Sequence, residues 1–292
     1  PYPVVVKADG PALGKGVFIA QNEAQARSAV YLLMEQAAFG ESGSRVVIEE
    51  FLTGNEASVL AFTDGKTLVP MVSALDHKRA LDGDNGPNTG GMGSLAPNPY
   101  YTEEAARQCM EQIFLPTMRA MNAEGRTFSG CLYFGLMLTS DGPKVIEYNC
   151  RFGDPETQAV LPLLETDLFE IMLAVDEGRL SEVPVRFSSR SACCVVLASK
   201  GYPQEYHTGC PILRNGADEL PQVSVFHAGT KLREGVLISS GGRVLGVTAV
   251  DETPRLAQQR AYAALGQIEF ENAAYRSDIG TRAIAYGERK HG

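Results

Sequence analysis

Two oxygen-bearing side chains, Glu147 and Asn149, lie two positions apart in the segment Lys144–Glu156 (KVIEYNCRFGDPE). On a β-strand, residues two apart point to the same face, so this carboxylate and this amide would lie side by side. Mg²⁺ takes such oxygen ligands and usually completes its octahedron with water and substrate phosphates. Arg151 follows with a planar guanidinium that suits a carboxylate or a phosphate. Burying these groups together is costly without such a task, so we favour a metal–phosphate site over a solvated strand face.

A glycine-rich segment, Lys7–Val17 (KADGPALGKGV), carries Lys15 between two glycines. It departs from a Walker A loop, because three residues rather than four separate its first two glycines and Gly16 stands where a Ser or Thr would contact Mg²⁺. A strand follows it, so no helix N-terminus is available to hold a phosphate. The pattern is equally compatible with a flap that folds over a polyphosphate and with a plain glycine hairpin that exposes a lysine.

Two further polar stretches suit the two ends of a nucleotide. Ile48–Leu52 (IEEFL) and Glu56 offer acceptors for amino and hydroxyl groups, although paired carboxylates at a strand end are more often simply solvated. Asp76–Arg79 (DHKR) precedes Gly86–Gly93 (GPNTGGMG), where four glycines in eight positions allow a ligand to approach the backbone closely. With Lys78 and its basic neighbour beside it, we interpret this stretch as an anion site rather than an ordinary turn-rich loop.

The elements that must position these residues follow from periodicity and turn residues. Apolar runs at 4–6 and 17–19 predict a hairpin, and Asn22 with Gln25 predicts a capped helix reaching about residue 37. Strands are expected at 45–48, 57–62, 67–72, 131–138 and 144–148, a long loop over 80–99, and helices over 102–125 and 163–177. Beyond a boundary at 184–191, strands are expected at 192–198, 223–226, 236–239 and 244–250, with a helix from Thr253 to about residue 268.

Length and composition restrict the class of protein. At 292 residues the chain exceeds one typical core, so we expect two packed units, perhaps with a small lid. Hydrophobic residues make up 44% and charged residues 21%, which argues against disorder and a coiled coil. No run approaches the roughly 18 to 20 apolar residues of a membrane helix. A net charge of −9 disfavours binding to nucleic acid.

The six cysteines form no C-x-x-C pair, and adjacent Cys193 and Cys194 would point to opposite faces of a strand. They read as small buried hydrophobes of a reducing compartment, and with no signal peptide the sequence indicates a cytoplasmic protein. The chain starts at Pro1 without an initiator Met and enters a strand at once. We therefore expect it to be a fragment of something longer.

These motifs, in this order, resemble the phosphoribosylamine–glycine ligases (glycinamide ribonucleotide synthetases) of the ATP-grasp superfamily. The resemblance covers essentially the whole chain, through 6–17 (VKADGPALGKGV), 48–52 (IEEFL), 76–79 (DHKR), 86–93 (GPNTGGMG), 149–158 (NCRFGDPETQ), 225–231 (VFHAGTK), 240–247 (SGGRVLGV) and 275–282 (YRSDIGTR). It implies an α+β ATP-grasp fold. We therefore expect a lid subdomain over 1–52 that is incomplete at its N-terminus, a central mixed sheet with helices and the metal site over 53–187, and a small α+β domain over 188–292.

The implied activity joins glycine to 5-phosphoribosylamine, giving glycinamide ribonucleotide, ADP and phosphate through a glycyl phosphate, in de novo purine biosynthesis. ATP is the co-substrate and Mg²⁺ or Mn²⁺ the metal, so the expected partners are small molecules, with no nucleic acid, no membrane and an oligomeric state that the sequence does not reveal. The resemblance carries over Glu147 and Asn149 as metal ligands. It carries over Lys7, Lys15, Glu49, Glu50, Phe51, Leu52, Glu56, Arg79 and Asn88 as nucleotide contacts, and Asp76, Arg151 and Asp154 as groups that hold glycine or phosphoribosylamine.

Three departures from the family pattern affect these expectations. Pro11 and Leu13 replace residues that are usually Leu and Ala in the lid loop, and Gly135 stands where many ATP-grasp proteins carry a second metal-binding acid. The resemblance also starts within the ATP-grasp domain, so we expect this chain alone to bind ATP but to turn over poorly. Two alternatives remain: another ATP-grasp carboxylate–amine ligase, such as a carboxylase subunit or a dipeptide ligase, and a nucleotide-binding fragment without activity. GPNTGGMG and SGGRVLGV disfavour the other ligases.

Overall fold

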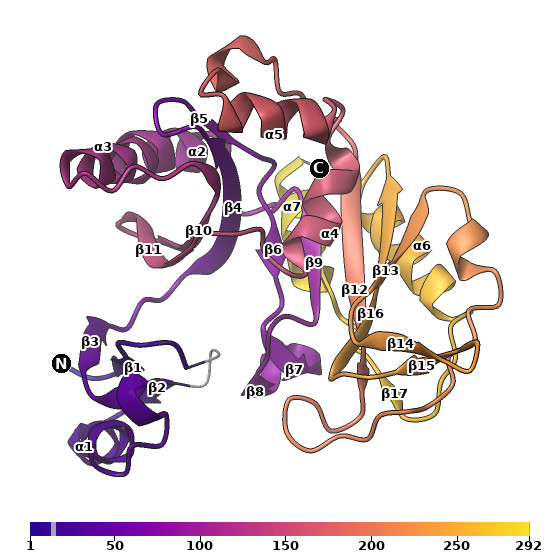
Figure 1. The fold of residues 1–292 in the computed structure, drawn as a ribbon, viewed down its shortest axis with the longest axis horizontal. Helices are drawn as coiled ribbons and strands as arrows, with labels where there is room; N and C mark the ends of the chain where they lie inside the picture. The colour runs from indigo at the N-terminus through magenta and orange to yellow at the C-terminus, as the bar shows by residue number, and fades with distance from the viewer. Residues whose placement is uncertain (13–15, 292) are drawn as a thin grey trace. The chain divides into compact units, whose positions relative to one another are not determined.

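In a computed structural model of the chain, residues 1–12 and 16–291 are described, and the chain divides into two compact units, Pro1–Thr53 and Gly54–Gly292 (Figure 1). Each unit has apolar clusters of its own. The three-part division expected from the sequence, with boundaries after 52 and 187, stays a prediction.

The first unit is an antiparallel sheet with one helix packed on it. Its strands follow the order β2-β1-β3, with β1 over Val4–Ala8, β2 over Val17–Ala20 and β3 over Val46–Glu50. The β1–β2 hairpin confirms the expected pairing of the two apolar runs. A small core of Val6, Ala29 and Leu33 holds the helix to the sheet.

Helix α1 (Glu23–Val30) begins where the capping residues predict. The side chain of Asn22 accepts a hydrogen bond from the Gln25 N–H at 3.0 Å, and Gln25 Oε1 accepts one from the Gln21 N–H at 2.8 Å. The helix continues as a π-helical turn, Tyr31–Glu35, so it ends two residues earlier than the apolar pattern suggests.

The first sheet of the second unit has the order β11-β10-β4-β5: β11 Gly142–Asn149, β10 Gly130–Thr139, β4 Asn55–Thr63 and β5 Leu68–Pro70. One face packs on α2 (Glu103–Cys109), a π-helical turn (Met110–Phe114) and α3 (Leu115–Ala123), which together form the expected 102–125 helix. The other face packs toward α4 (Glu156–Val160) and α5 (Leu168–Asp176) (Figure 1). We expected a mixed sheet, but its described strand pairs are all antiparallel.

The second sheet has the order β13-β16-β12-β9-β6, with β17 pairing β12. Its strands are β13 Val223–His227, β16 Arg243–Asp251, β12 Ser191–Ser199, β9 Gly93–Ala96, β6 Leu75–Asp76 and β17 Ala273–Ala274. Residues from both sides of position 187 therefore share one sheet. Helices α6 (Pro254–Leu265) and α7 (Thr281–His291) and the ribbon β14–β15 (Thr230–Arg233, Val236–Ser239) complete this part.

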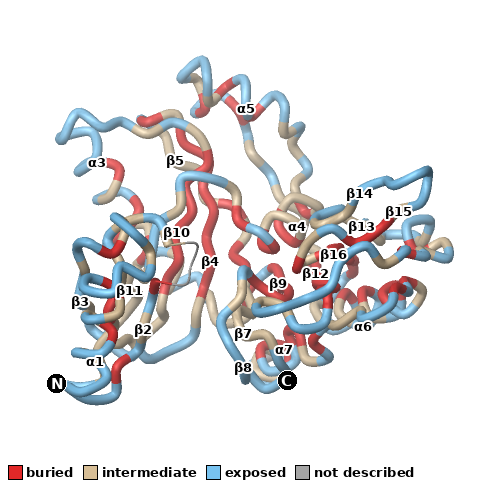
Figure 2. Tube along the Cα trace, turned by 60° about the horizontal axis from the view of Figure 1, so that its bottom comes forward, coloured by how far each residue is buried: buried red, intermediate tan, exposed pale blue. Residues whose placement is uncertain are grey.

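The buried residues of the second unit concentrate in its two sheets, and β4 and β12 are buried along almost their whole length (Figure 2). Cys193 and Cys194 pack into different clusters on opposite faces of β12, as expected. Short 3₁₀ turns lie at Gly40–Gly43, Asp82–Asp84, Leu161–Leu163, Leu180–Glu182 and Ala217–Glu219. Among the helices of the described residues, none has the length and apolar content to cross a bilayer.

The expected loop over 80–99 is wrong. This stretch holds the ribbon β7–β8 (Arg79–Leu81, Asn85–Asn88) and the buried strand β9. Its glycines and asparagines conceal strand character, because β9 is held by pairing with β12, about a hundred residues away in the sequence.

The helix expected over 163–177 is present but starts later than predicted, since α5 covers only Leu168–Asp176. The chain forms α4 earlier and starts α5 at Leu168, with Asp167 Oδ1 accepting from the Phe169 N–H at 2.8 Å. Between these helices Leu164 forms a β-bridge with Phe187, and this tertiary pairing interrupts the helical pattern.

Candidate functional site

One face of the β4–β10–β11 sheet collects polar side chains. Gly135 on β10 pairs with Glu147 on β11 and with Ser58 on β4, while Tyr133 pairs with Asn149. Directly paired residues share a face, so Ser58, Tyr133, Glu147 and Asn149 lie on one side of the sheet. The alternation that predicted a common face for Glu147 and Asn149 is confirmed.

Ser58 and Tyr133 form a buried hydrogen-bonded group with Glu156. The Ser58 and Tyr133 hydroxyls are 2.8 Å apart, and Ser58 Oγ donates to Glu156 Oε1 at 3.1 Å. Burial, and then the nearby Glu156 carboxylate, raise the pKa of Tyr133 above its ordinary value, so this phenol stays protonated. The group fixes α4 against the sheet immediately below the more exposed acids.

Lys78 joins the acids of this face. Its Nζ lies 3.2 Å from Glu56 Oε2 on β4 and 3.9 Å from Glu147 Oε1 on β11. Burial lowers the pKa of Lys78, but Glu56, Asp76 and Glu147 together outweigh burial and raise it above its usual value. Lys78 is therefore a permanent cation that neutralises part of a strongly acidic cluster.

Gly135 is constrained by the expected metal ligand. A Cβ placed on Gly135 would lie 3.0 Å from Glu147 Cγ and 3.3 Å from Tyr133 Cε1. Both contacts are tighter than ordinary van der Waals distances, so an acidic side chain at position 135 would press on Glu147. The lack of an acidic residue at position 135 is therefore consistent with the limited space beside Glu147.

Asp76, at the end of β6, has an oxygen that nothing satisfies within the described part of the chain. Its Oδ1 is shielded from solvent and has no hydrogen-bond partner there. Burial and then the Glu156 carboxylate raise the pKa of Asp76 well above its usual range, although Lys78 opposes this. A shielded acceptor that lacks a donor is costly, which makes Asp76 a candidate for binding an amine or a hydroxyl group.

The glycine-rich stretch passes directly over Asp76. Gly91 has φ +115°, and a Cβ there would lie 2.6 Å from Asp76 Oδ1 and 2.3 Å from Pro155 Cδ. Arg243 on β16 fixes the same stretch, since its Nη1 donates to Gly90 O at 2.9 Å and to Asp154 O at 2.7 Å. The segment around Asp154 and the glycines are thus held together over Asp76.

The other site residues expected in the second unit are half-buried or exposed. Arg79 and Asn88 pair across the ribbon β7–β8, and Arg79 Nη1 donates to Gly86 O at 2.8 Å. Arg151 is exposed, and its Nη1 donates to Phe152 O at 2.8 Å. Asp154 Oδ1 accepts from Gln158 at 3.0 Å and lies 3.2 Å from Arg243 Nη1. The structure thus gathers Glu56, Asp76 and Glu147 around Lys78.

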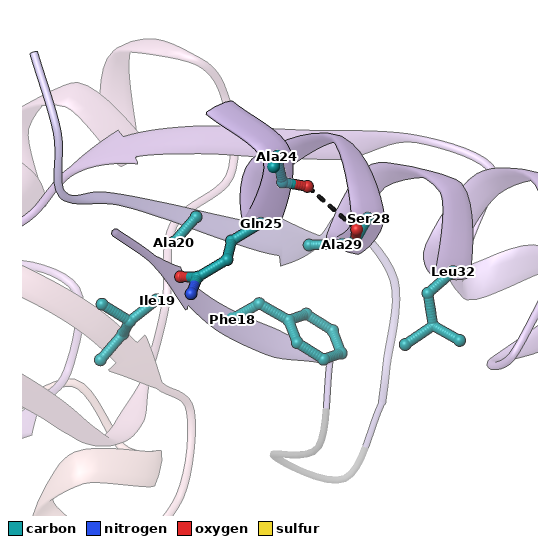
Figure 3. A pocket seen from close by; sticks show the side chains of 8 residues that line it. All are labelled: Phe18, Ile19, Ala20, Ala24, Gln25, Ser28, Ala29 and Leu32. Atoms are coloured by element: carbon teal, nitrogen blue, oxygen red, sulfur yellow. Dashed lines mark hydrogen bonds between the residues drawn. The ribbon is translucent and has the colours of Figure 1, made fainter. Parts of the chain in front are cut away.

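In the first unit, Lys7 on β1 and Glu49 on β3 form an ion pair of 2.5 Å. Glu50 ends β3, and Phe51 and Leu52 follow it half-buried. Leu13 and Lys15 lie outside the described residues. A pocket of about 440 Å³ opens between β2 and α1, lined largely by apolar side chains such as Phe18 and Leu32 (Figure 3). It contains none of the expected site residues.

No group of three His, Cys, Asp or Glu residues in the described 1–12 and 16–291 is arranged to hold a metal by itself. The oxygens of Glu147 and Asn149 supply two donors on one face. Such a pair suits a metal that takes its other ligands from water and a bound phosphate.

Sequence patterns alone did not assign Lys78, Ser58, Tyr133, Glu156 and Arg243 to the site. Lys78 was visible as a basic residue beside the glycines, but its acidic partners come from three different strands. The buried Ser58–Tyr133–Glu156 group has no local signal, since Ser58 is 75 residues from Tyr133 and 98 from Glu156 in the sequence.

Two family models match the chain. The ATP-grasp (A) domain of phosphoribosylglycinamide synthetase matches residues 1–157, and the C domain of the same enzyme matches residues 192–282.

Curated relatives cover nearly the whole chain. Phosphoribosylamine–glycine ligase of Caldanaerobacter subterraneus is 47% identical over 95% of this chain and 66% of its own length, and that of Vibrio vulnificus is 48% identical over 99% and 67%. The human trifunctional purine biosynthetic protein adenosine-3 is 47% identical over 97% of this chain and 28% of its own length. The chain thus spans about two thirds of the ligases it matches.

Solved structures with a similar fold include a member of the same family. The crystal structure of phosphoribosylamine–glycine ligase from Thermotoga maritima superposes with a TM-score of 0.83 at 36% identity, covering 95% of this chain and 68% of that one. The biotin carboxylase domain of the Hydrogenobacter thermophilus 2-oxoglutarate carboxylase, bound to MgADP, superposes at 0.70 and 15% identity over 94% and 59%, which supports the fold alone. The chain has the α+β ATP-grasp fold and belongs to the phosphoribosylamine–glycine ligase family.

Proposed function

We propose that this chain carries the ATP-binding and metal-binding part of an enzyme that ligates glycine to 5-phosphoribosylamine, giving glycinamide ribonucleotide, ADP and phosphate in purine biosynthesis. Family membership supports the reaction, since the relatives of that name are 47–48% identical to the chain. The observation that carries the site is the gathering of Glu56, Asp76 and Glu147 around Lys78 beside Asn149. Six cysteines without a disulfide among the described residues support the expected cytoplasmic location.

Glu147 and Asn149 are the proposed ligands of Mg²⁺ or Mn²⁺. Their side chains share a face, the Glu147 side chain is about half exposed, and its Oε1 lies 3.9 Å from the Lys78 ammonium, which is consistent with a carboxylate that faces a cation. When bound with ATP, the metal would neutralise charge on the transferring phosphoryl group.

The reaction consists of two displacements. The glycine carboxylate attacks the γ-phosphorus of ATP and expels ADP, which gives glycyl phosphate. The phosphoribosylamine nitrogen then attacks the glycyl carbonyl, loses a proton and expels phosphate, which forms the amide. The chain needs no covalent nucleophile of its own, because positioning and charge neutralisation supply most of the rate.

Individual side chains suit these tasks to different degrees. Asp76 is the favoured acceptor for a substrate amine, because its shielded Oδ1 lacks a donor within the described residues. The oxygen of Asp154 already serves Arg243 and Gln158, which makes it a weaker candidate. Arg151 is exposed and is proposed to hold a carboxylate or a phosphate.

The nucleotide contacts are proposed on the family resemblance. They are Lys7, Lys15, Glu49, Glu50, Phe51, Leu52, Glu56, Arg79 and Asn88. For three of them the structure gives an ionic contact. Lys7 and Glu49 are ion-paired, and Glu56 lies against Lys78.

Calorimetry with ATP tests the metal site. The double variant Glu147→Gln/Asn149→Ala should lose the Mg²⁺-dependent part of its ATP affinity, because both oxygen donors are weakened or gone, and we expect a loss of roughly tenfold or more. Glu124→Gln, an exposed acid-to-amide change at the end of α3, is the matched control and should bind like the wild-type chain.

Unchanged metal-dependent affinity in the double variant would contradict the site. An assay of ADP release tests the substrates: release that needs glycine and phosphoribosylamine supports the proposed ligation. Release with a different acid and amine points to another ATP-grasp ligase. Metal-dependent ATP binding without any release identifies the chain as a binding fragment.

A further inference from the structure

The ribbon β7–β8 lacks a core of its own. Residues 81–88 are exposed without exception, and none of them belongs to an apolar cluster among the described residues. An isolated two-stranded hairpin is at best marginally stable in water. The ribbon also begins at Arg79, the residue directly after Lys78. Something outside the ribbon must therefore fix its conformation and, with it, the position of Lys78.

Arg276 supplies that support, although it lies far away in the sequence. Its side chain is only 1% exposed. Its Nε and Nη2 donate to both oxygens of Asp278 at 2.7 and 2.8 Å, and its Nη1 donates to Asp84 Oδ1 at 2.9 Å and to Arg79 O at 3.1 Å. A buried guanidinium is tolerated only when its donors are satisfied, and here two of its acceptors, Asp84 and Arg79, belong to the ribbon segment.

The residues beside Arg276 add further bonds to the same segment. Asp278 Oδ2 accepts from the Gly83 N–H at 2.8 Å, and Asp82 Oδ1 accepts from the Ser277 N–H at 2.8 Å. His77 Nε2 accepts from the Gly280 N–H at 3.0 Å, on the other side of Lys78. Lys78 is thus held from both its neighbours in sequence, Arg79 and His77.

The supporting segment is itself anchored in the C-terminal core. The Tyr262 hydroxyl on α6 donates to Arg276 O at 2.6 Å and accepts from the Ile279 N–H at 3.1 Å. A continuous series of contacts therefore runs from α6 through Arg276 to the ribbon and to Lys78 beside Glu147.

We infer that Arg276 is a positioning residue that holds the ribbon β7–β8, and through it Lys78, in the arrangement that the acidic cluster needs for binding metal and nucleotide. The inference rests on the proposed function, because it assigns Arg276 to the site of Glu147. It also gives residues 275–282 a task that composition and charge do not show.

The test compares Arg276→Lys with Asp84→Asn. A lysine keeps a charge beside Asp278 but cannot donate to both carboxylates and to Arg79 O. Asp84→Asn removes one carboxylate of the ribbon segment, which is 46% exposed and also pairs with Arg282. It leaves the Arg276–Asp278 pair intact, so it covers the case in which Arg276→Lys does not fold. The control is Arg255→Lys, an equal change in the bidentate pair of Arg255 with Glu288, away from the ribbon.

Three quantities are measured on the full chain: amide exchange at Gly83 and Ser277, the urea midpoint, and the affinity for ATP with Mg²⁺. We expect both ribbon variants to exchange these amides at least roughly tenfold faster and to lose roughly tenfold in Mg²⁺–ATP affinity. The urea midpoint of Asp84→Asn should stay near that of Arg255→Lys, whereas Arg276→Lys should lower it because it disrupts a buried network. A purely structural role would lower the midpoint and leave the affinity of the folded protein unchanged.

The outcomes separate the two proposals. If the wild-type chain binds Mg²⁺–ATP and both ribbon variants bind it with the same affinity, the positioning role is overturned and the proposed function stands. Faster exchange without a change in affinity would also overturn it, because the ribbon's order would then not matter to the site. A wild-type chain that binds no Mg²⁺–ATP would overturn the proposed function and the positioning role together.

Discussion

At the scale of single residues, Gly91 shows why the glycine-rich stretch is needed. The sequence predicted that glycines there allow close approach of a ligand, but the atoms that come closest are the protein's own. A Cβ would meet Pro155 Cδ and Asp76 Oδ1. The residue type was thus predictable from the motif, whereas its physical reason depends on segments 15 and 64 positions away.

Gly91→Ala should destabilise the second unit by more than the backbone cost alone. A positive φ costs an alanine about 1 to 3 kcal/mol, and the two short contacts should add about 1 to 3 kcal/mol of overpacking. Urea unfolding gives the difference. Gly178→Ala is the control, since Gly178 also has positive φ (+68°) but nothing within 4 Å of its Cβ. Equal losses for both variants would show that the contacts with Asp76 and Pro155 are relieved at little cost.

At the scale of elements, strand alternation was enough to place Glu147 and Asn149 together, because that relation lies within β11 alone. The position of Lys78 between Glu56 and Glu147 could not be predicted in this way. It depends on the end of β6 approaching the β4–β10–β11 sheet, and β6 is held in place through β9 and β12. Relations within one element were therefore predictable, and those set by long-range pairing were not.

His77, which follows β6, makes the stability of this region depend on pH. Its Nε2 accepts from Gly280, so its proton sits on Nδ1, which donates to Gly93 O at 3.3 Å. Burial, and then the nearby Arg276 charge, lower the pKa of His77 to about 4 from 6.5. The unfolded chain then binds more protons between these values, so stability is lost as the pH falls from about 6.5 to 4, by at most about 3 kcal/mol.

The acid loss is measured as the free energy of unfolding between pH 7 and pH 4. His77→Gln, whose amide oxygen can still accept from Gly280, should show a smaller loss over this range than the wild-type chain. Exposed His207→Gln should keep the full loss. Asp76, whose pKa is raised, acts in the opposite direction, so only the difference between variant and wild type isolates His77. Parallel curves for all three proteins would show that His77 is not the group involved.

At the scale of the whole molecule, the two units differ in the size of their cores. The first unit buries Val6, Ala29 and Leu33 in one small cluster, whereas the second has three clusters that run along two sheets. A unit of 53 residues buries a smaller fraction of its surface and is correspondingly less stable. Local patterns predicted the β1–β2 hairpin and helix α1 of the first unit, whereas the sheet built on β6, β9 and β12 in the second unit depends on long-range pairs that they did not reveal.

Amide exchange should therefore be faster in β1 than in β12, whose nine residues are all buried. Adding ATP with Mg²⁺ should slow exchange in β1 and at 49–52, if the proposed contacts of Lys7 and Glu49–Leu52 are right. AMP with Mg²⁺ is the control for β1, because it lacks the β- and γ-phosphates of ATP but keeps the adenosine that 49–52 would contact. Equal exchange in β1 and β12, or no slowing of β1 by ATP beyond that by AMP, would contradict this prediction.

The sheet that contains β6, β9, β12 and β16 also limits how such a chain can be cut or recombined. A truncation after residue 187 would strip β12 from β9, expose an open strand edge and invite aggregation. We therefore expect proteins formed by gene fusion to keep the ATP-grasp and C segments together. The human trifunctional protein fits this expectation, since it aligns with 97% of this chain in one stretch of 284 residues.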